Sequence, residues 1–513
     1  MTLDWTAGYT AEVDYTYGYY AELNPLRMRL ALLQAGLACP PVGAACELGF
    51  GQGMSVNLHA AGGGVQWWGT DFNPAQARFA QDLAAAAGAG ARLHDDAFAD
   101  FAQRTDLPDF DFMALHGIWS WVSDANRQVI VDLVRRRLKP GGVLYISYNT
   151  MPGWASFAPM RHLLALHGQT QGNAAQGVLA RVDGALAFAT RLMEAQPQLG
   201  KAHPQLAQRL EALGRNNRQY LAHEYFNEHW QPMYFSDMQR WLGGAKLQFA
   251  CSAHLLDHLD ALNLTAPQQA LLASQPDAAW RETVRDFLVN QQFRRDYWVK
   301  GARRLSALEQ GEQWRQLRLM LTSRREGLEV KLAGRLGEAK PQGAVYDAVL
   351  DALADHAVLT VGELEGRLAH LPGLTLAKLR EVVVALAGAG HVALAQEPAA
   401  AEAARGACQR LNAEIMHRSR SSTDFSCLAS PVTGGGVAVQ RFTQLFLAAQ
   451  AQGHTNAEGM ASHVWNILNV QGQKILKDGK ALRTEPENLA ALQQQAQEFL
   501  SHQLPLLQRL GVA

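Results

Sequence analysis

Glycine residues spaced to hold a nucleotide occur early in the chain. The segment Glu47-Leu48-Gly49-Phe50-Gly51-Gln52-Gly53 lies between an apolar strand expected at 44–48 and a helix expected at 55–61. Glycine lets the backbone turn tightly and approach a ligand closely. The dinucleotide fingerprint would need Gly or Ala three residues after Gly51, but Met54 stands there. The spacing therefore favours the E-x-G-x-G-x-G variant, in which the loop packs under a nucleoside with an amino-acid tail.

Two acidic positions follow the next strands. Asp71 ends the expected strand 65–70, 24 positions after Glu47, which is close to the roughly 20-residue offset of a carboxylate that binds ribose hydroxyls. Its alternative role is to cap the helix that begins at Asn73-Pro74. Asp96 follows a short strand expected at 92–94, where a carboxylate or backbone group could receive an adenine amino group, or could simply belong to a solvated turn.

These positions require a sheet that brings several strand ends together. Apolar strands alternate with helices over about 150 residues, which indicates an α/β fold with a doubly wound parallel sheet. Such sheets bind ligands at the carboxyl ends of their strands. The expected strands are 44–48, 65–70, 92–94, 110–115 and 143–148, and a further strand at 246–251 resumes the sheet after a helical insertion at about 155–225.

Composition divides the rest of the chain. We expect a first domain at 1–255, a helical middle region at 220–340, a winged-helix-like module at 341–398 and a mostly helical region at 399–513 that opens with an alanine-rich linker at about 398–407. Within the middle region, residues 281–340 are expected to be helical and carry 14 basic and 8 acidic residues. This stretch could dock an acidic protein or could be a solvated face with helical ion pairs.

The module at 341–398 is expected to contain three helices, at 345–353, 361–369 and 376–387, and a hairpin at 388–395. Its three Lys or Arg residues face seven acids, whereas phosphate contacts need a basic surface. We therefore expect no nucleic-acid partner. The last hundred residues are candidates for completing a substrate groove or for pairing two subunits as a homodimer.

Charge and cysteine content exclude several classes of protein. Among 513 residues, 46 Lys and Arg balance 47 Asp and Glu, so no global field favours nucleic acid or anionic lipid. No apolar run is long enough for a membrane span, and no export signal is visible at the start. The five cysteines form no CxxC pair, so neither a disulfide framework nor a zinc site is expected. We expect a cytoplasmic protein without a metal.

Several of these segments resemble a known family. The segment 47–53, Asp71, Asp96-Ala97 and Leu138-Lys139-Pro140-Gly141-Gly142 are similar to the ordered motifs of class I S-adenosylmethionine-dependent methyltransferases. A narrower group, the bacterial methyltransferases with a methyltransferase regulatory domain, includes protein-lysine methyltransferases that act on outer-membrane proteins. The segments that resemble this group are Asn24-Pro25, 69–74, 116–121, 148–154 and 223–227.

The resemblance implies S-adenosylmethionine as the cofactor. The implied cofactor-binding residues are Glu47, Gly49, Phe50, Gly51, Gln52, Gly53, Asp71, Phe72, Asp96, Ala97, His116 and Gly117. Glu47 would orient the loop near the methionine end and Asp71 would hold the ribose. Asp96 would lie at the adenine, with His116 and Gly117 beneath the sulfonium.

Methyl transfer to a lysine needs a neutral amine, whose ordinary pKa is about 10.4. An apolar, aromatic channel lowers that pKa, and aromatic faces also attract cations. The candidate substrate contacts are Tyr17, Tyr20, Trp119, Trp121 and Trp154, although such rings could equally be core or lid packing. Tyr148 and Asn149 are candidates for positioning the acceptor. His116 could take the acceptor proton, or the proton could leave to water.

The sequence thus predicts an S-adenosylmethionine-dependent methyltransferase, with a protein lysine as the acceptor implied by the resemblance. Two alternatives stay open. One is a methyltransferase for a small molecule, and the other is a cofactor-sensing regulatory protein without turnover. An acceptor channel beside the cofactor favours catalysis, because a sensor needs none.

Overall fold

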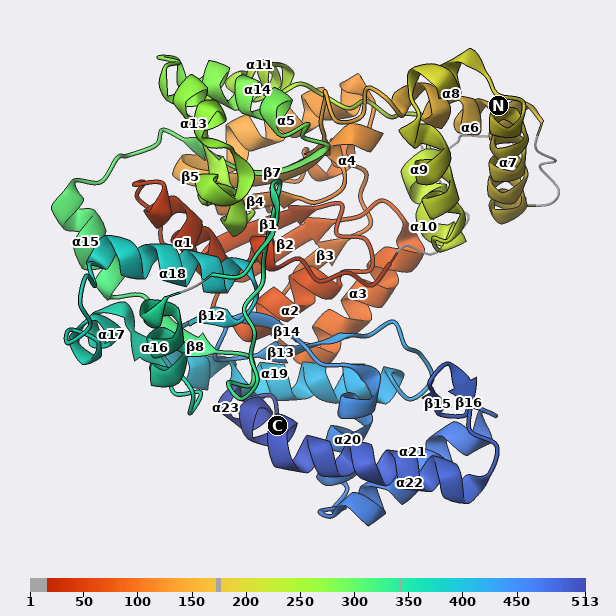
Figure 1. Ribbon diagram of the computed structural model, residues 1–513, viewed down its shortest axis with the longest axis vertical. Helices are drawn as coiled ribbons and strands as arrows, with labels where there is room; N and C mark the ends of the chain where they lie inside the picture. The colour runs from red at the N-terminus through yellow and green to blue at the C-terminus, as the bar shows by residue number, and fades with distance from the viewer. Residues whose placement is uncertain (1–15, 172–176, 342) are drawn as a thin grey trace.

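The computed structural model describes residues 16–171, 177–341 and 343–513 of the chain (Figure 1). Its centre is a seven-stranded sheet with the strand order β3-β2-β1-β4-β5-β7-β6. The strands are β1 (Ala44–Leu48), β2 (Gln66–Thr70), β3 (Arg92–His94), β4 (Phe110–Leu115), β5 (Leu138–Asn149), β6 (Leu247–Ser252) and β7 (Phe293–Lys300). The first five strands run parallel, and β7 is antiparallel to both β5 and β6. The predicted doubly wound α/β sheet is confirmed.

Both faces of this sheet are covered, which explains the apolar strands. Parallel sheets are buried on both sides and therefore read as nearly continuous hydrophobic runs. In β4 and β5, residues 112–115 and 143–149 are all buried. The helices of this part are α1 (Pro25–Gln34), α2 (Met54–Gly62), α3 (Pro74–Ala87), α4 (Phe98–Phe101) and α5 (Asp124–Arg137). Two short 3-10 turns, η1 (Ala21–Leu23) and η2 (Trp119–Trp121), precede α1 and follow β4.

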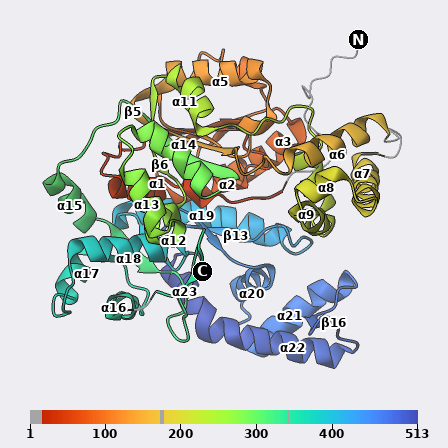
Figure 2. The same ribbon diagram turned by 45° about the horizontal axis from the view of Figure 1, so that its top comes forward.

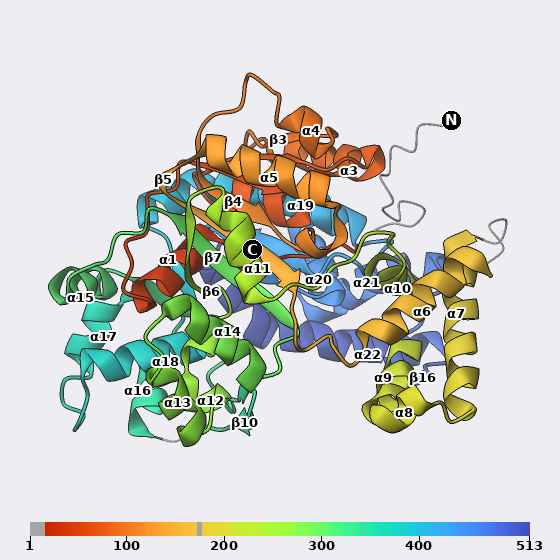
Figure 3. The same cartoon turned by 90° about the horizontal axis from the view of Figure 1, so that it is seen from above.

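A helical lobe is inserted between β5 and β6. Its helices are α6 (Ala158–Thr170), α7 (Gly177–Glu194), α8 (Gln198–Ala202), α9 (Gln205–Gly214) and α10 (Arg218–Tyr225). The lobe has an apolar core of its own, which begins at Trp154 and ends at Tyr225. Figures 1 and 3 show the lobe at one side of the molecule, opposite α15–α18, so it joins the sheet only along its inner border.

The middle region combines helices with the two strands that complete the sheet. Its further elements are α11 (Phe235–Gly243), η4 (Leu255–His258), α12 (Asp260–Asn263), α13 (Ala266–Ala273), α14 (Ala278–Leu288), α15 (Ala307–Arg315), β8 (Arg318–Leu321), β9 (Leu332–Gly334) and β10 (Gly337–Ala339). The prediction that 281–340 is wholly helical is wrong, because β7 to β10 lie within it. Strand β7 could not be recognised in the sequence because it contains Arg294, Arg295 and Asp296. Ion pairs that form on folding balance these charges.

The next unit holds the three helices predicted for 341–398. They are α16 (Ala344–Ala352), α17 (Val361–Arg367) and α18 (Leu376–Gly388), with β11 (Leu359–Thr360) and β12 (Val392–Ala395). The hairpin predicted at 388–395 is wrong. That segment supplies the single strand β12, which pairs antiparallel with β8 in the sheet β11-β8-β12. Strand β8 lies before the predicted module, so the winged-helix assignment and the division into domains stay proposals.

The last part of the chain packs beneath the first. It consists of α19 (Pro398–Arg418), β13 (Cys427–Ser430), β14 (Gly435–Ala438), α20 (Arg441–Ala451), α21 (Ala457–Val470), β15 (Leu476–Lys477), β16 (Lys480–Ala481), α22 (Glu485–Glu498), η5 (Phe499–Gln503) and α23 (Leu504–Arg509). The predicted linker at 398–407 is wrong, because it forms the first half of α19, which lies against α2 and α3. Figure 2 shows α20–α22 on the far side of the molecule from α5 and α11.

Candidate active site

The glycine loop between β1 and α2 has the backbone that its sequence suggests. Gly49, Gly51 and Gly53 have φ angles of 71°, 57° and 68°. This left-handed region strains residues with a side chain. A Cβ atom at Gly49 would also collide with Ile118, and one at Gly53 would collide with Ala80. The loop therefore presents bare backbone at the carboxyl end of β1, where a ligand can approach closely.

Asp71 ties this loop to the end of β2. Its Oδ2 accepts a hydrogen bond from the Gly51 amide at 2.8 Å, and its Oδ1 accepts one from the Asn73 amide at 3.0 Å. The helix α3 is capped by Asn73, whose side chain accepts from the Ala75 amide. The alternative role of Asp71 as the helix cap is therefore wrong. Phe72, which follows it, is partly exposed.

Glu47 and Asp71 form a buried acidic pair. They are 1% and 6% exposed, and Oε2 of Glu47 has no hydrogen-bond partner among the described residues. Burial, with a smaller contribution from the neighbouring Asp71 carboxyl, raises the pKa of Glu47 to about 8. Burial also raises the pKa of Asp71 to about 7. Two such carboxyl groups would be stabilised by a ligand that brings hydroxyl donors and a positive charge, as S-adenosylmethionine does, so the residues fit this cofactor.

The remaining loop residues complete the same edge. Phe50 and Gln52 are 5% and 4% exposed and support the loop from within. The Asp96 carbonyl accepts from the Thr70 hydroxyl, and the Asp96 side chain forms an ion pair with Arg104 at 3.1 Å. Ala97 caps α4 and is exposed. Asp96 thus lies at the end of β3 beside Asp71, with part of its hydrogen-bonding capacity already used.

His116 and Gly117 follow β4, where the sequence places the sulfonium side. The His116 ring stacks on the Tyr20 ring with centroids 3.5 Å apart, and its Nδ1 lies 2.8 Å from the Tyr145 hydroxyl. The Gly117 amide donates to the Ser147 hydroxyl at 2.8 Å. Burial lowers the pKa of His116 to about 4. A histidine with this pKa is neutral at pH 7 and is a weak base, which disfavours the proposed proton-accepting role.

Glu22 is a residue of this region that the sequence analysis missed. It is 7% exposed and forms an ion pair with Arg295 of β7, and its charge acts on His116. Burial raises the pKa of Glu22, but the Arg295 and Arg27 guanidinium groups outweigh burial and hold that pKa below its ordinary value. The carboxylate is therefore ionised at neutral pH. The only signal in the sequence is an acid within the aromatic segment before Asn24-Pro25.

The two residues expected to position the acceptor, Tyr148 and Asn149, differ in whether their polar side-chain atoms already have a hydrogen-bond partner. Tyr148 is fully buried, and its hydroxyl donates to Asp296 at 2.8 Å. Because this hydroxyl already donates to a neighbour inside the sheet, the structure gives no support to an acceptor contact of Tyr148, which stays a prediction. Asn149 is 4% exposed, and its Nδ2 has no hydrogen-bond partner among the described residues. It remains a candidate for contact with a ligand at the end of β5.

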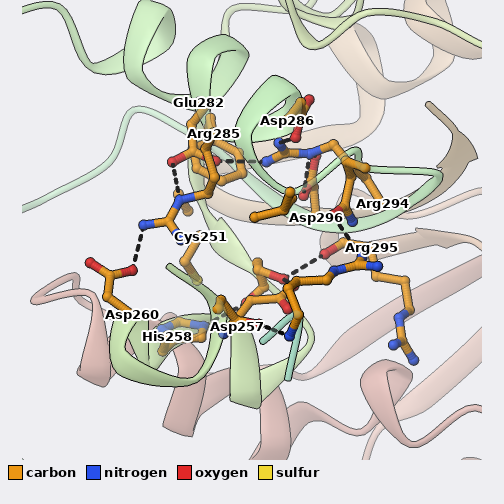
Figure 4. Close-up of a pocket in the computed structure, with 17 residues that line it drawn as sticks. Cys251, Asp257, His258, Asp260, Glu282, Arg285, Asp286, Arg294, Arg295 and Asp296 are labelled. Atoms are coloured by element: carbon orange, nitrogen blue, oxygen red, sulfur yellow. Dashed lines mark hydrogen bonds and ion pairs between the residues drawn. The ribbon is translucent and has the colours of Figure 1, made fainter. Parts of the chain in front are cut away.

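Through Asp296, Tyr148 joins a charged network beside a cavity of about 280 Å³ between β6, β7, α12 and α14. Figure 4 shows the residues that line this cavity. The Arg294 guanidinium forms ion pairs with Asp286 at 2.6 Å, Glu282 at 2.9 Å and Asp296 at 2.9 Å. Across the cavity, Arg285 pairs with Asp260 at 2.6 Å. The network holds α14 against the end of the sheet and connects it to β5 through Tyr148. It accounts for several charges that looked like a solvated basic face in the sequence.

The predicted substrate aromatics do not gather in one channel. Tyr20 stacks on His116, but Tyr17 packs between Phe79 and Phe425 with centroids 5.1 and 5.0 Å away. The other three are buried among other side chains. Trp119 is fully buried against Trp241, Trp121 donates from Nε1 to the Glu224 carbonyl, and Trp154 belongs to the core of the helical lobe.

Two further features bear on the class of protein. Within residues 16–171, 177–341 and 343–513, no group of three or more His, Cys, Asp or Glu side chains could hold a metal ion. In the same ranges, every helix is too short or too polar to span a bilayer.

Comparisons with known proteins agree with this site. Residues 45–142 match the family described as "Methyltransferase domain", and residues 217–300 match the family "Predicted methyltransferase regulatory domain". The uncharacterized protein sll1526 of Synechocystis sp. is 39% identical over 520 residues and covers 100% of both chains. The uncharacterized protein RP789 of Rickettsia prowazekii is 25% identical over 295 residues, which cover 55% of this chain and 51% of the relative.

A solved structure shares the fold over nearly the whole length. PKMT2 from Rickettsia typhi in complex with AdoHcy aligns with a TM-score of 0.67 and 16% identity over 96% of this chain and 99% of that one. The methyltransferase-domain match spans the glycine loop and both acids of the buried pair. The chain therefore belongs to the class I S-adenosylmethionine-dependent methyltransferases that carry a methyltransferase regulatory domain, with S-adenosylmethionine as the cofactor.

Proposed function

We propose that this methyltransferase modifies lysine side chains of a protein acceptor. The observation that carries the proposal is the ionised, nearly buried carboxylate of Glu22 next to His116, at the carboxyl end of β4. A buried carboxylate beside a neutral imidazole and the Tyr20 ring suits a cationic acceptor with an aliphatic stem. The resemblance to protein-lysine methyltransferases, stated from the sequence, supports the same acceptor.

The cofactor would lie over the ends of β1, β2 and β4. The backbone of the glycine loop would approach it, with Asp71 toward the ribose hydroxyls and Glu47 toward the charged methionine end. Asp96, Ala97 and the adjoining Phe72 would border the adenine. When bound, the cofactor would supply a sulfonium methyl group, whose carbon an aligned neutral amine attacks in line while the S–CH3 bond breaks and the thioether leaves; alignment alone can supply several kcal/mol, up to about 7–11 in favourable cases.

The chain's own residues then have to capture and neutralise the amine. Glu22, which Arg295 keeps ionised, would attract the incoming ammonium toward His116. Removal from water among Tyr20, His116 and the end of β5 favours the neutral amine, so the proton leaves to solvent as the side chain enters. Asn149 can hydrogen-bond the acceptor there. His116 stays neutral and keeps its ring in place through Tyr145.

Labelling of a host lysate tests the acceptor class. The purified chain is incubated with methyl-labelled cofactor and lysate, and labelled species are identified by mass spectrometry. The proposal predicts label on lysine side chains of protein, and less of it with Asp71→Ala. Label only in small molecules would support the small-molecule alternative. Cofactor binding without any labelled species would support a sensor.

Other features of the acceptor complex belong to the same proposal. A protein partner would have to reach the carboxyl ends of β4 and β5, between the helical lobe and α14 (Figure 1). Pairing of two chains through the region 399–513 and a cytoplasmic location stay predictions.

A further inference from the structure

An aromatic cluster follows β5 where the helical lobe meets the sheet. We call Trp154, Phe157, Tyr225 and Trp230 the aromatic box. The Trp154 ring lies 5.0 Å from Trp230, 6.1 Å from Tyr225 and 6.3 Å from Phe157, measured between centroids. Phe157 and Tyr225 lie 6.2 Å apart. The indole nitrogens of both tryptophans are buried without a hydrogen-bond partner among the described residues. Ring faces and edges thus bound the box, and the partly buried Glu224 carboxyl next to Tyr225 acts on Tyr225 and on Arg161.

A cation of the chain itself fills the box. The Arg209 guanidinium carbon lies 4.6 Å from the Trp154 centroid and 4.1 Å from the Phe157 centroid. Cations within about 6 Å of an aromatic face are attracted by the ring. A second guanidinium, from Arg161, lies 4.7 Å from the Trp230 centroid. The box therefore has the geometry of a cation-binding site.

Arg209 is held there by neutral groups. With the Gln292 amide oriented so that its oxygen faces Arg209, this oxygen accepts from Nη1 at 2.9 Å and also from Nη2. The other partner is the Tyr225 hydroxyl. Arg209 forms no ion pair with any carboxylate in the described part of the chain. Burial lowers its pKa because the charge is partly removed from water. A half-buried cation without a counter-ion is the kind of group that another cation can replace without leaving a carboxylate unpaired.

The box lies next to the acceptor end of the sheet. Gln292 accepts from the Thr150 amide at 2.9 Å through its carbonyl. Its neighbour Phe293 pairs with Asn149 across β5 and β7 and contacts the His116 ring with centroids 6.4 Å apart. One residue, Phe293, thus separates Gln292, which Arg209 contacts, from the imidazole at the proposed transfer site.

We infer that the aromatic box is a binding site for an alkylammonium side chain of the acceptor protein, lysine or methylated lysine, and that Arg209 occupies it until the acceptor arrives. This inference rests on the proposed lysine acceptor. Arginine and the alkylammonium side chain are both cationic, so replacing Arg209 with the acceptor side chain leaves the charge of the box unchanged. Methylated lysine suits such a site better than arginine does, since its charge is spread over carbons that pack on ring faces and it needs no hydrogen-bond acceptors.

Binding of small probes to the full chain tests the inference without methyl transfer. The probes are Nα-acetyl-lysine methylamide, its Nε-trimethyl form and its neutral Nε-acetyl form, followed by tryptophan fluorescence. Arg209→Ala should bind the trimethyl probe about tenfold more tightly than the unaltered protein, because a site filled by its own side chain loses apparent affinity by the occupied fraction. Arg209→Gln, which keeps a hydrogen-bonding group, should change affinity in the same direction.

Two controls test whether a gain in probe affinity comes from the aromatic box. Arg418→Ala removes a guanidinium that lies 4.6 Å over Phe79, outside the box, and should leave probe affinity unchanged. Adding Trp154→Leu to Arg209→Ala should abolish the gain. The inference is overturned if both Arg209 variants keep the circular dichroism and cofactor affinity of the unaltered protein yet bind the trimethyl probe no better, or if the neutral probe gains equally. Label on protein lysine in the lysate experiment would still support the proposed function in that case.

Discussion

The Gly51 amide donates to Oδ2 of Asp71 at 2.8 Å, which joins the glycine loop to the end of the neighbouring strand. This single bond links the two parts that must act together on the cofactor. The loop offers bare backbone, and the carboxylate that fixes the loop is also the group expected to meet the ribose. Loss of Asp71 would therefore remove a ligand contact and a constraint on the loop.

Asp71→Ala should weaken S-adenosylmethionine binding by about 1–3 kcal/mol, the usual cost of leaving buried polar groups without partners. Titration calorimetry measures the change. Asp95→Ala is the matched control, since Asp95 is exposed on the turn after β3 and should have no effect. Unchanged affinity in a folded Asp71→Ala protein would remove Asp71 from the ribose site.

Glu47 should couple folding stability to pH. Burial raises its pKa to about 8 in the folded protein, above the ordinary value of 4.5. The folded state therefore binds an extra proton between these values, and stability from this group is present below about pH 4.5 and is lost as pH rises toward 8. Glu47→Gln should flatten the fall in melting temperature between pH 5 and 8.5 in the absence of cofactor. If the melting temperature of Glu47→Gln falls as steeply as that of the unaltered protein, the raised pKa of Glu47 is contradicted.

The same pKa predicts a proton released on cofactor binding. A positive charge near Glu47 favours its carboxylate, so binding at pH 7 should release a fraction of a proton. Calorimetric titrations in two buffers with different ionisation enthalpies measure this number. Glu47→Gln should reduce the release. Equal heats in both buffers for the unaltered protein would show that no charge reaches Glu47.

Glu22→Gln should raise the KM for a lysine acceptor about tenfold, since hydrogen bonds to charged groups contribute roughly 1.5–3 kcal/mol. Cofactor affinity should change little. Loss of the carboxylate also lowers the pKa of a nearby amine, so the rise of the rate with pH should move to lower pH. Glu326→Gln is a suitable control, because Glu326 is an exposed partner of Arg324. A normal KM and an unmoved pH profile would exclude Glu22 from acceptor binding.

Tyr148→Phe should lower the free energy of unfolding by about 1–3 kcal/mol, because it leaves the buried Asp296 carboxylate without its hydroxyl donor. Urea denaturation followed by circular dichroism measures the loss. Tyr220→Phe changes a tyrosine that is 41% exposed and should have a smaller effect. Equal stabilities of the Tyr148→Phe and unaltered proteins would mean that the network in Figure 4 does not depend on this bond.

The parts of the fold that follow from local patterns could be predicted. Strands β1, β2, β4 and β5 contain apolar runs close to glycine or proline turns, and the α/β alternation dictates a parallel sheet whose carboxyl ends gather Glu47, Asp71 and His116. The alanine-rich segment 398–407 was misassigned because its composition suggested a linker. Alanine has the highest helix propensity, and here α2 and α3 offer a surface for the resulting helix.

The features that depend on distant contacts could not be predicted. Arg294 and Asp296 make β7 look solvent-exposed in the sequence, and only the packing of α14 on the sheet brings Asp286, eight positions before Arg294, into an ion pair with it. The Tyr148 hydroxyl bonds to Asp296, 148 positions away in the chain. The alternation of side chains along β5 does not tell which face of the sheet offers Tyr148 a polar partner. Glu22 is kept ionised by Arg295, which lies 273 positions later in the chain on β7.

A crystal structure of the chain with S-adenosylhomocysteine would test the cofactor site most directly. The account predicts ribose hydroxyls within hydrogen-bonding distance of Asp71, the nucleoside over the Gly49–Gly53 loop and the sulfur facing His116. A ligand seated elsewhere, or one whose ribose leaves Asp71 bonded only to Gly51 and Asn73, would contradict it.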